Sequence, residues 1–158
     1  MVKLHKNFIT KEESELILDN LDDYNNGQVS SMRCWLAGKI VDKLSEDFHF
    51  KVSGMSSYTI DTTENGTVED TWASSGRRSH PESPWHQDMD GDGIMKVGSS
   101  LLIRKPKSGG NISFGDDMYG SNKVTIDRGL YDLACWTGDE WHMVDPSSGH
   151  RVVFLLHI

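Results

Sequence analysis

Three residues of this chain have the types and the spacing of metal ligands. His86 and Asp88 lie two positions apart, and His142 follows 54 positions after Asp88. Two imidazoles and one carboxylate make up the 2-His-1-carboxylate triad, which holds Fe(II) on one face and leaves its other coordination positions open. On an extended strand, residues i and i+2 point to the same side, so His86 and Asp88 can reach one ion while Gln87 points away. Open positions would let a co-substrate and O2 meet on the metal, and the pattern therefore predicts an oxidative enzyme.

Arg151, nine positions after His142, is the candidate for binding such a co-substrate. It precedes the apolar run 152–156, where an inward guanidinium is costly without an anionic partner. The far carboxylate of a small diacid would be that partner, because its two oxygens match the planar fork of arginine. The alternative is an ordinary salt bridge at the surface.

The acidic segment after His86 also permits other metals. Asp88, Asp90 and Asp92, followed by Gly93, have the D-x-D-x-D-G form of a calcium-binding loop. An EF-hand would need Glu at position twelve, where Ser99 stands, and a helix on each side, which the sequence does not predict. Zinc in the triad stays possible, since one water would complete a tetrahedral hydrolytic site. The arginine nearby argues against zinc.

The remaining histidines are interpreted as ordinary core or surface residues, because a lone histidine usually has no ligand role. These are His5, His49, His80 and His157. His150 precedes Arg151 on the same predicted strand, so we expect the two side chains to point to opposite faces.

The first 48 residues predict helices that support this site. Thr10 to Glu13 has the S/T-x-x-E form of a capping box, ahead of an apolar group at 16–18. After a turn at 25–27, a second amphipathic helix is predicted over 32–48, with one apolar face made by Leu36, Ile40, Val41 and Leu44. We expect these helices to buttress one face of a sheet and to carry no chemistry.

From Phe50 onward, short strands alternate with turn signals. Strands are predicted at residues 51–60, 97–104, 110–114, 123–126, 131–136 and 151–157. The polar stretch 61–84 has little periodicity, and a loop of that length in a compact domain is usually functional or mobile. Helices followed by evenly spaced strands indicate an α+β chain whose strands form a jelly-roll barrel, also called a double-stranded β-helix. We expect residues 1–158 to be one domain, with helical support in 1–49 and the jelly-roll core in 50–158.

Composition and charge limit the classes of function. The net charge is −8, and such an acidic surface repels phosphate backbones, so nucleic-acid binding is disfavoured. The basic pair Arg77 and Arg78 is interpreted as part of a solvated loop. No apolar run is long enough to span a membrane, and the first residues lack the apolar core of a signal peptide. Cys34 and Cys135 do not make a disulfide framework, so we expect a cytoplasmic protein, in a reducing compartment that suits ferrous iron.

Three stretches of the second half carry a resemblance to a known family. They are His86–Asp88 with Gly91–Gly93 behind it, the Gly-Gly hairpin at 107–114, and His142–Pro146 followed by Gly149–Arg151. In this order the motifs are specific, and they span residues 86–158, nearly half of the chain. The chain resembles the Fe(II)/2-oxoglutarate-dependent dioxygenases, and among them the prolyl-hydroxylase-like branch.

The resemblance implies cofactors and residue roles. Fe(II) would be held by His86, Asp88 and His142, while 2-oxoglutarate would chelate the ion and pair its C5 carboxylate with Arg151. O2 would take the remaining position, and the products would be a hydroxylated substrate, succinate and CO2. Family members that transfer halide replace the carboxylate ligand with a small residue, so the presence of Asp88 implies hydroxylation or a related oxidation.

The chain departs from the family at the hydroxyl group that assists the arginine. The tyrosine of the prolyl-hydroxylase branch falls at about Leu102 here, and the serine that another branch places two residues after the arginine is replaced by Val153. We therefore expect Tyr58 to assist Arg151 in binding 2-oxoglutarate, with Ser100 as the weaker candidate.

For the substrate, the resemblance favours a peptide or protein. The spacing from His142 to Arg151, together with Gly91–Gly93, looks most like the oxygen-sensing prolyl hydroxylases, which implies a prolyl or other residue as the target. The nucleic-acid demethylase branch is disfavoured, because His157 stands where its second arginine would be. The alternatives are hydroxylation of a free amino acid or small metabolite, and a non-catalytic or zinc-binding jelly-roll module.

Aromatic residues near the first ligand are candidates for the substrate mouth. Trp85 is adjacent to His86, and Trp72 lies in the long stretch 61–84. Simple packing of these tryptophans against strands is the alternative interpretation.

Overall fold

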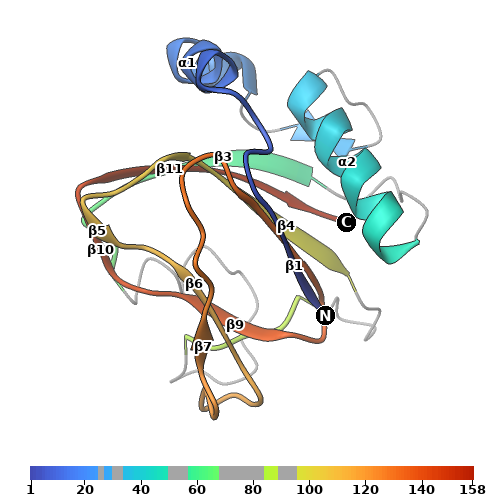
Figure 1. Cartoon of the computed structure of the whole chain (residues 1–158), viewed down its shortest axis with the longest axis vertical. Coiled ribbons are helices and arrows are strands. Elements are labelled where there is room, and N and C mark those ends of the chain that lie inside the picture. The colour runs from blue at the N-terminus through green and yellow to red at the C-terminus, as the bar shows by residue number, and fades with distance from the viewer. Residues whose placement is uncertain (25–26, 30–33, 50–56, 68–83, 89–95) are drawn as a thin grey trace.

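The computed structural model describes residues 1–24, 27–29, 34–49, 57–67, 84–88 and 96–158. Its elements form layers. Helices α1 (Lys11–Asp19) and α2 (Trp35–Phe48) lie on one side of a six-stranded sheet, and a three-stranded sheet lies on the other side (Figure 1). A short 3₁₀ helix, η1 (Leu21–Tyr24), follows α1.

The six-stranded sheet has the order β1-β8-β4-β11-β3-β2, and all its neighbours are antiparallel. Its strands are β1 (Val2–His5), β2 (Gly27–Gln28), β3 (Ser57–Glu64), β4 (Val97–Arg104), β8 (Leu133–Thr137) and β11 (His150–His157). Strand β11 pairs with β3 over its whole length and with β4 from Val152 to His157, with an irregularity between Val152 and Val153. Strand β11 therefore has a hydrogen-bonded neighbouring strand along each of its two edges.

Two smaller sheets are built from strands that lie between Ser108 and Ser148. Strands β6 (Ile112–Gly115), β7 (Val124–Thr125) and β9 (Trp141–Val144) form a sheet of order β7-β6-β9, and β5 (Ser108–Gly109) pairs with β10 (Ser147–Ser148). The protein is thus mostly β with two helices, as the sequence predicts, and the helices buttress the large sheet. Among the strands that the structure describes, no ladder joins the sheets into a closed barrel.

The structure confirms the predicted capping box of α1 and the predicted apolar face of α2. Oγ1 of Thr10 accepts a hydrogen bond from the backbone N–H of Glu13 at 3.1 Å, and Oε1 of Glu13 accepts one from the N–H of Thr10 at 2.9 Å, which completes the capping box. Helix α2 buries the predicted face of Leu36, Ile40, Val41 and Leu44 and ends at His49 in the left-handed conformation (φ 52°). Residues 32–33, at its predicted start, lie outside the described part of the chain.

The two faces of the large sheet have different environments. Every second residue of β11, starting from Val152, packs in the main core with the helices; these residues are Val152, Phe154 and Leu156. The alternate residues Arg151, Val153 and His157 therefore point to the opposite face, because successive side chains of a strand point to opposite sides. On that inner face a second cluster joins β6 and β8, made of Ile112, Phe114, Ala134 and Trp136.

The prediction that the first 48 residues are helical is wrong at two places. Val2–His5 forms β1, paired with β8, and Gly27–Gln28 forms β2, paired with β3. In β1, Val2 and Leu4 alternate with polar residues and pack on the second cluster, which is the pattern of an edge strand with one covered face. Strand β3 also extends to Glu64, so the long stretch 61–84 begins as a strand, and its residues 68–83 lie outside the described residues.

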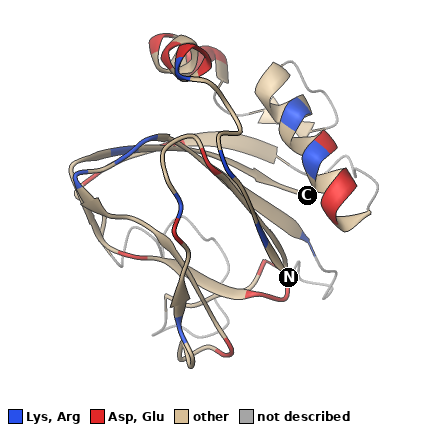
Figure 2. Cartoon of the chain, viewed as in Figure 1, with Lys and Arg blue, Asp and Glu red and all other residues tan. Residues whose placement is uncertain are grey.

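Charged side chains lie mainly on the helices and loops. Acidic residues predominate on α1, and residues of both signs alternate along α2 (Figure 2). In the described part of the chain, no helix is both long and apolar enough to cross a membrane.

Candidate metal centre

Strand β9 brings the two histidine ligands together. The backbone N–H of His86 donates to the carbonyl of His142 at 3.1 Å, and the N–H of His142 donates to the carbonyl of His86 at 2.9 Å. Their rings lie 4.2 Å apart between centroids. On its other side β9 pairs with β6, where Phe114 stands opposite His142, so both rings point to the inner face of the large sheet.

The backbone of Asp88 is held by the turn after β8. Its N–H donates to the carbonyl of Gly138 at 2.9 Å, and its carbonyl accepts from the N–H of Lys96 at 3.3 Å. A Cβ at position 138 would collide with the carbonyl oxygen of Asp88, so only glycine permits this approach. Gln87 instead donates its amide N–H to the carbonyl of Asp139 at 2.7 Å, and it points away from the triad as predicted.

The three predicted ligands converge. One ligand atom from each of His86, Asp88 and His142 lies within 4.8 Å of the others. Nε2 of His86 is 3.9 Å from Oδ1 of Asp88, and Nε2 of His142 is 3.3 Å from Oδ2 of Asp88. The structure therefore assembles the donor set that the H-x-D pattern and the distant histidine predict.

Hydrogen bonds on the far side of each ring select the nitrogen that faces this centre. Nδ1 of His86 lies 3.0 Å from the carbonyl of Pro84, and Nδ1 of His142 lies 2.9 Å from the carbonyl of Glu140. A carbonyl oxygen only accepts, so Nδ1 carries the hydrogen in both rings. Each Nε2 is left with its lone pair toward the centre, which is the tautomer that a metal ion requires.

The protonation states also suit a cation. Burial lowers the pKa of His142 to about 4, which the charge of Asp88 offsets only in part. Burial acts to raise the pKa of Asp88, but a hydrogen bond from His157, the neighbouring imidazoles and the indole of Trp136 outweigh it, and the pKa of Asp88 falls well below its usual range. A neutral imidazole and an ionised carboxylate are the forms that bind a divalent metal ion.

These residues fit Fe(II). Two imidazole nitrogens and one carboxylate oxygen form a three-ligand set, and the other coordination positions of the ion would be open to small molecules. The same three donors would also accept zinc. The choice between the two metals therefore depends on what lies beside the triad.

Trp136 and Gly98 support the carboxylate from the large sheet. Nε1–H of Trp136 donates to Oδ2 of Asp88 at 2.7 Å. Gly98 stands directly opposite Trp136 in the pairing of β4 with β8, and a Cβ there would lie 2.5 Å from Nε1 of the indole. Neither residue is predicted from the sequence to belong to the site, because a tryptophan and a glycine inside predicted strands give no signal of a metal centre.

His157 lies beside the centre, which its sequence position alone does not predict. Its Nε2 is 3.5 Å from Oδ2 of Asp88, and its ring packs edge-on against Trp136. The converging group of ligand atoms does not include His157, but this residue contacts the carboxylate of Asp88. Residues 151 and 157 are six positions apart on one strand, so their shared face was a signal that could have indicated this placement.

Arg151 is buried on the same inner face, at the opposite end of β11 from His157. It is 5 % exposed, and its Nε–H has no hydrogen-bond partner among the described residues. Burial lowers the pKa of Arg151, against the nearby charge of Asp61. The Gly-Gly hairpin packs on its side chain, since a Cβ at Gly110 would lie 2.9 Å from Cδ of Arg151. This is the setting in which a guanidinium requires an anionic ligand.

The structure does not bring Tyr58 to Arg151. Tyr58 stands opposite Leu156, which faces the helices, and its ring stacks on Phe154 with centroids 5.6 Å apart. It therefore lies on the other face of the sheet from Arg151, and the expectation that Tyr58 binds 2-oxoglutarate is wrong.

Ser100 does lie on the inner face, but it is engaged by another residue. It stands opposite Leu155, and its Oγ accepts a hydrogen bond of 2.6 Å from Nη1 of Arg128. Leu102 and Val153 stand opposite each other on this face, 3 % and 0 % exposed, and form an apolar wall.

Of the other residues singled out from the sequence, those that the structure describes lie away from this centre. Trp85 is buried against Gly115 and Gly120 beside the β6–β7 connection, so it packs there and does not line an open mouth. Nδ1 of His150 lies 2.8 Å from Nη1 of Arg104, so the side chain of His150 points away from Arg151, as predicted. Several candidates lie outside the described residues: Trp72, Arg77, Arg78, His80, Asp90, Asp92 and Gly93.

A second group of possible metal ligands lies near the start of the chain. Nε2 of His5 is 2.6 Å from Oδ2 of Asp47, and the thiol of Cys135 lies close to both. Burial raises the pKa of Cys135 to about 12, so this thiol stays protonated and is a poor ligand. We interpret the group as an ion pair.

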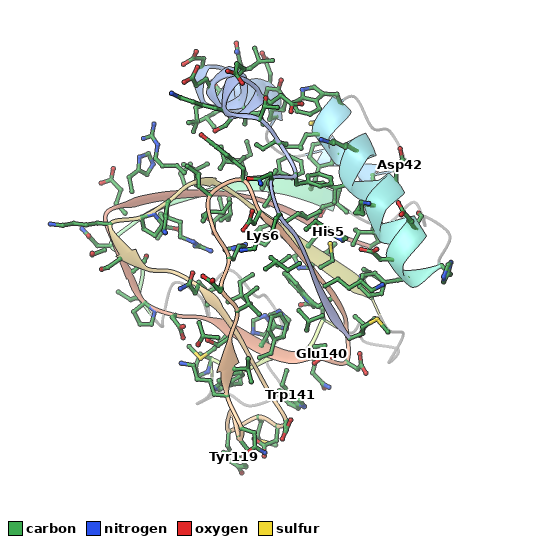
Figure 3. All side chains as sticks on the ribbon, viewed as in Figure 1. His5, Lys6, Asp42, Tyr119, Glu140 and Trp141 are labelled. Carbon is green, nitrogen blue, oxygen red and sulfur yellow. The ribbon has the colours of Figure 1, made fainter. Side chains whose placement is uncertain are left out.

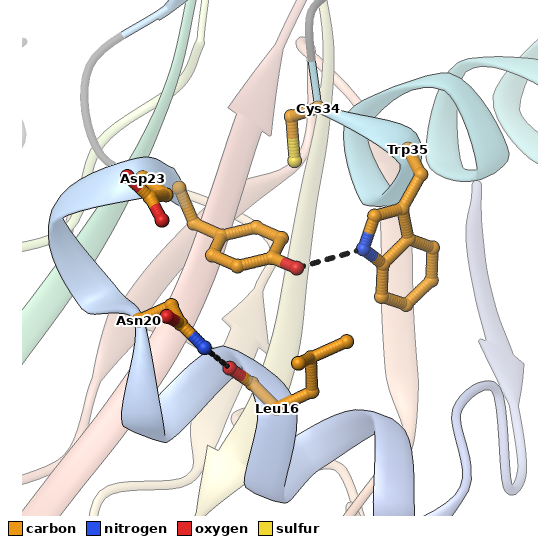
Figure 4. Close-up of a pocket in the computed structure, with 6 residues that line it drawn as sticks. Leu16, Asn20, Asp23, Cys34 and Trp35 are labelled. Atoms are coloured by element: carbon orange, nitrogen blue, oxygen red, sulfur yellow. Dashed lines mark hydrogen bonds between the residues drawn. The ribbon is translucent and has the colours of Figure 1, made fainter.

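A pocket lies on the helix side of the large sheet, between α1, η1 and the start of α2 (Figure 4). It is lined by Leu16, Asn20, Asp23, Tyr24, Cys34 and Trp35. Nε1–H of Trp35 donates to the hydroxyl of Tyr24 at 2.9 Å, and the amide of Asn20 donates to the carbonyl of Leu16 at 2.9 Å. These polar groups bond to the protein itself, and the pocket suggests no chemistry.

Comparison with solved structures identifies the fold. A prolyl-4-hydroxylase from Pseudomonas putida superposes with a TM-score of 0.64 at 11 % identity, over 99 % of this chain and 82 % of that one. A viral collagen prolyl hydroxylase from Paramecium bursaria Chlorella virus-1, solved as a 2OG complex, gives 0.60 at 10 % identity over 99 % and 94 %. The apo form of the non-heme monooxygenase ThoJ gives 0.61 at 12 % identity over 99 % and 72 %.

These likenesses are structural only. No family model matches the sequence, and no curated protein sequence is similar to it. The chain has the fold of the prolyl hydroxylases, which confirms the resemblance inferred from its motifs at the level of the fold.

Proposed function

We propose that this chain is an Fe(II)- and 2-oxoglutarate-dependent dioxygenase that hydroxylates a C–H bond, with a prolyl or other residue of a peptide or protein as its substrate. One observation carries the proposal: the converging ligands His86, Asp88 and His142 share an inner face with Arg151, a buried guanidinium that has a free N–H. A hydrolytic zinc centre has no need of such an arginine. A diacid co-substrate supplies the anion that the arginine lacks.

The bound metal would supply one part of the chemistry. Fe(II) would couple the oxidation of 2-oxoglutarate by O2, to succinate and CO2, to the insertion of one oxygen atom into the substrate C–H bond. The protein would bind and orient the reactants. Asp88 brings the negative charge that offsets the cation, and His86 and His142 present neutral nitrogens.

The surroundings of the triad would fix these positions. Trp136 holds the carboxylate of Asp88 in one orientation through its 2.7 Å hydrogen bond. Arg151 would bind the C5 carboxylate of 2-oxoglutarate, and the apolar pair Leu102 and Val153 would keep water away from that end of the pocket.

One exposed and one half-buried aromatic side chain support a peptide substrate. Tyr119, 77 % exposed, lies in the connection between β6 and β7, and Trp141 precedes His142 on β9. Both lie at the end of the molecule away from the helices (Figure 3). Three of the structural neighbours are prolyl hydroxylases by name, which supports the same substrate class.

We also propose that the fold is a double-stranded β-helix. Two sheets that face each other across the triad are the arrangement that a double-stranded β-helix needs. We infer that residues 1–158 form a single domain of this type, with the triad between its sheets.

The test is an anaerobic titration of the Fe(II)-loaded protein with 2-oxoglutarate, in which the metal-to-ligand charge-transfer band is followed. A saturable band is expected for the wild type and none for His142→Ala. His150→Ala is the matched control, since His150 lies on β11 and faces Arg104, so its titration should equal that of the wild type. A succinate-release screen against proline-containing peptides and small metabolites then identifies the substrate. A wild type that binds Fe(II) but no 2-oxoglutarate would contradict the proposal and favour a zinc-binding module.

A further inference from the structure

Arg128 is a second buried arginine, which the proposed chemistry does not yet use. It lies between β7 and β8 and is 2 % exposed, so it is even more buried than Arg151. Taking a guanidinium out of water is unfavourable unless its charge is paired and its N–H groups are bonded. A buried arginine without both conditions therefore indicates a missing anion.

The contacts of Arg128 leave one edge of its guanidinium free. Nη1 donates to the carbonyl of Ser100 at 3.0 Å and to its Oγ at 2.6 Å. Nε and Nη2 are buried and have no hydrogen-bond partner among the described residues. These two N–H groups point the same way from one edge of the planar group, and they are the pair that matches the two oxygens of a carboxylate.

The acidic residue that acts most on Arg128 is already paired elsewhere. Asp132 is the acid whose charge favours the charged form of Arg128. Its carboxylate, however, accepts from the backbone N–H groups of Asn7 at 2.9 Å and Gly129 at 2.8 Å and lies 3.0 Å from Nζ of Lys6. Within the described part of the chain, no carboxylate lies within 4.0 Å of the Arg128 guanidinium.

Arg128 lies near Arg151, on the side toward the metal centre. Ser100, its partner, stands opposite Leu155, which lies between His157 at the triad end of β11 and Arg151 at the other end. Burial and the positive charge of Arg151 lower the pKa of Arg128 to about 9, so it stays charged at neutral pH. Two like charges thus share one buried region, and each has a free N–H.

We propose that Arg128 and Arg151 together bind the distal carboxylate of the co-substrate, Arg128 through its Nε–H and Nη2–H and Arg151 through its Nε–H. Arg128 takes the place of the hydroxyl group that Leu102 and Val153 do not provide. Ser100 is then a positioning residue, because it orients Arg128 and does not itself contact the co-substrate. This inference rests on the proposed function and names the second residue of its co-substrate site.

The test compares Arg128→Met with the wild type in calorimetric titrations of the Fe(II)-loaded protein with 2-oxoglutarate, without oxygen. Methionine replaces the aliphatic part of the side chain and removes the guanidinium with its charge and its fork. Affinity for 2-oxoglutarate should fall at least about 30-fold, as for other buried charge pairs that lose one partner. Affinity for Fe(II) should stay unchanged. Arg104→Met is the matched control, because Arg104 is an exposed arginine on β4, and its affinity should equal that of the wild type.

A stability measurement separates ligand binding from a structural role. Without 2-oxoglutarate, Arg128→Met should unfold at the same temperature as the wild type or a higher one, since it removes a buried charge that Arg151 repels. Addition of 2-oxoglutarate should then raise the unfolding temperature of the wild type far more than that of the variant. A structural arginine would give the opposite result, with a lower unfolding temperature and unchanged affinity.

A conservative variant provides an independent measurement. Arg128→Lys keeps the charge but loses the two-pronged edge, and its affinity for 2-oxoglutarate should fall at least about 10-fold. Wild-type affinity in Arg128→Met, or in Arg128→Lys if the methionine variant does not fold, would overturn the role of Arg128 and leave the proposed function intact. A wild type that binds no 2-oxoglutarate would overturn the proposed function, and this inference with it.

Discussion

Trp136 and Asp88 are joined by a hydrogen bond of 2.7 Å from the indole Nε1–H to Oδ2, the same oxygen that lies 3.3 Å from Nε2 of His142. Oδ1, the other oxygen of this carboxylate, faces His86 at 3.9 Å. The indole thereby fixes the rotation of the carboxylate so that Oδ1 faces His86 while Oδ2 faces His142 and His157. Contacts of this kind behind a ligand commonly change metal affinity by about 10–100-fold.

Replacement of Trp136 by phenylalanine isolates this hydrogen bond. Trp136→Phe keeps an aromatic ring against Phe114 but has no N–H to donate. We expect affinity for Fe(II) to fall about 10–100-fold, with little change in the fold. Competition with a calibrated chelator measures the affinity, and circular dichroism checks the fold. Wild-type affinity in this variant would show that the indole does not orient the ligand.

The sequence predicts the parts of the site that depend on spacing along one strand. His86 and Asp88 share a face because they lie two positions apart, and His142 and Arg151 belong to motifs of fixed order. Trp136 and Gly98 could not be predicted, because Trp136 reaches Asp88 only in the folded protein and Gly98 meets Trp136 only through the pairing of β4 with β8. Such cross-strand registers are properties of the folded sheet.

The dependence on cross-strand register also explains why the role predicted for Tyr58 is wrong. Its residue type and its strand were suitable, but the face that it occupies depends on its register with β11, which places it opposite Leu156. The helices were easier to predict, since the capping box of α1 and the apolar face of α2 are local patterns. Strand β1 is short and lies apart in sequence from its partner β8, and so its pairing was missed.

Asp88→Ala tests the triad. The substitution should abolish substrate-coupled succinate release and weaken Fe(II) binding strongly, because it removes the one charged ligand. The fold should be retained, since the backbone bond from Asp88 to Gly138 does not need the side chain. Single-turnover succinate release and thermal unfolding measure the two effects. Substrate-coupled turnover at the wild-type level would mean that the metal assignment is wrong.

Asp132→Asn tests the ion pair beside Arg128. Burial acts to raise the pKa of Asp132, but hydrogen bonds from Asn7, Lys6 and Gly129 outweigh it, so its pKa is lower in the folded protein than in the unfolded chain. Such a carboxylate stabilises the fold above its unfolded pKa, and this stabilisation is lost as the pH falls through the folded value.

At pH 7, Asp132→Asn should therefore lower the free energy of unfolding by about 1–3 kcal/mol. The difference from the wild type should shrink as the pH falls below about 4. Urea unfolding at several pH values measures both. Asp139→Asn, which changes an exposed carboxylate, is the control and should follow the wild type. An equal effect of Asp132→Asn at every pH would contradict the role of the charge.

Variants of Arg151 distinguish a 2-oxoglutarate-dependent enzyme from other proteins that use the same triad. Arg151→Lys keeps the charge but loses the planar fork, and it should weaken 2-oxoglutarate binding moderately. Arg151→Leu should weaken it by about 30-fold or more, since loss of one partner of a buried charge pair costs about 2–5 kcal/mol. Fe(II) affinity should change little in either variant. Anaerobic titration of the charge-transfer band gives the constants, and equal binding by wild type and Arg151→Leu would remove this arginine from the site.

Gly110 tests whether the hairpin positions that arginine. It has φ +73°, and a Cβ there would lie 2.9 Å from Cδ of Arg151. Gly110→Ala should therefore lower stability through backbone strain and also displace the arginine side chain, which weakens 2-oxoglutarate binding. The backbone strain is independent of residue 151, whereas the collision with Cδ is not.

A double-mutant cycle separates these two effects. In an Arg151→Ala background no Cδ is present, so Gly110→Ala should cost only the strain and should lower the unfolding temperature less than it does in the wild type. Its effect on 2-oxoglutarate affinity should disappear, because the residue through which it acts is absent. If Gly110→Ala has the same effects in both backgrounds, the hairpin glycine serves its own turn and does not position Arg151.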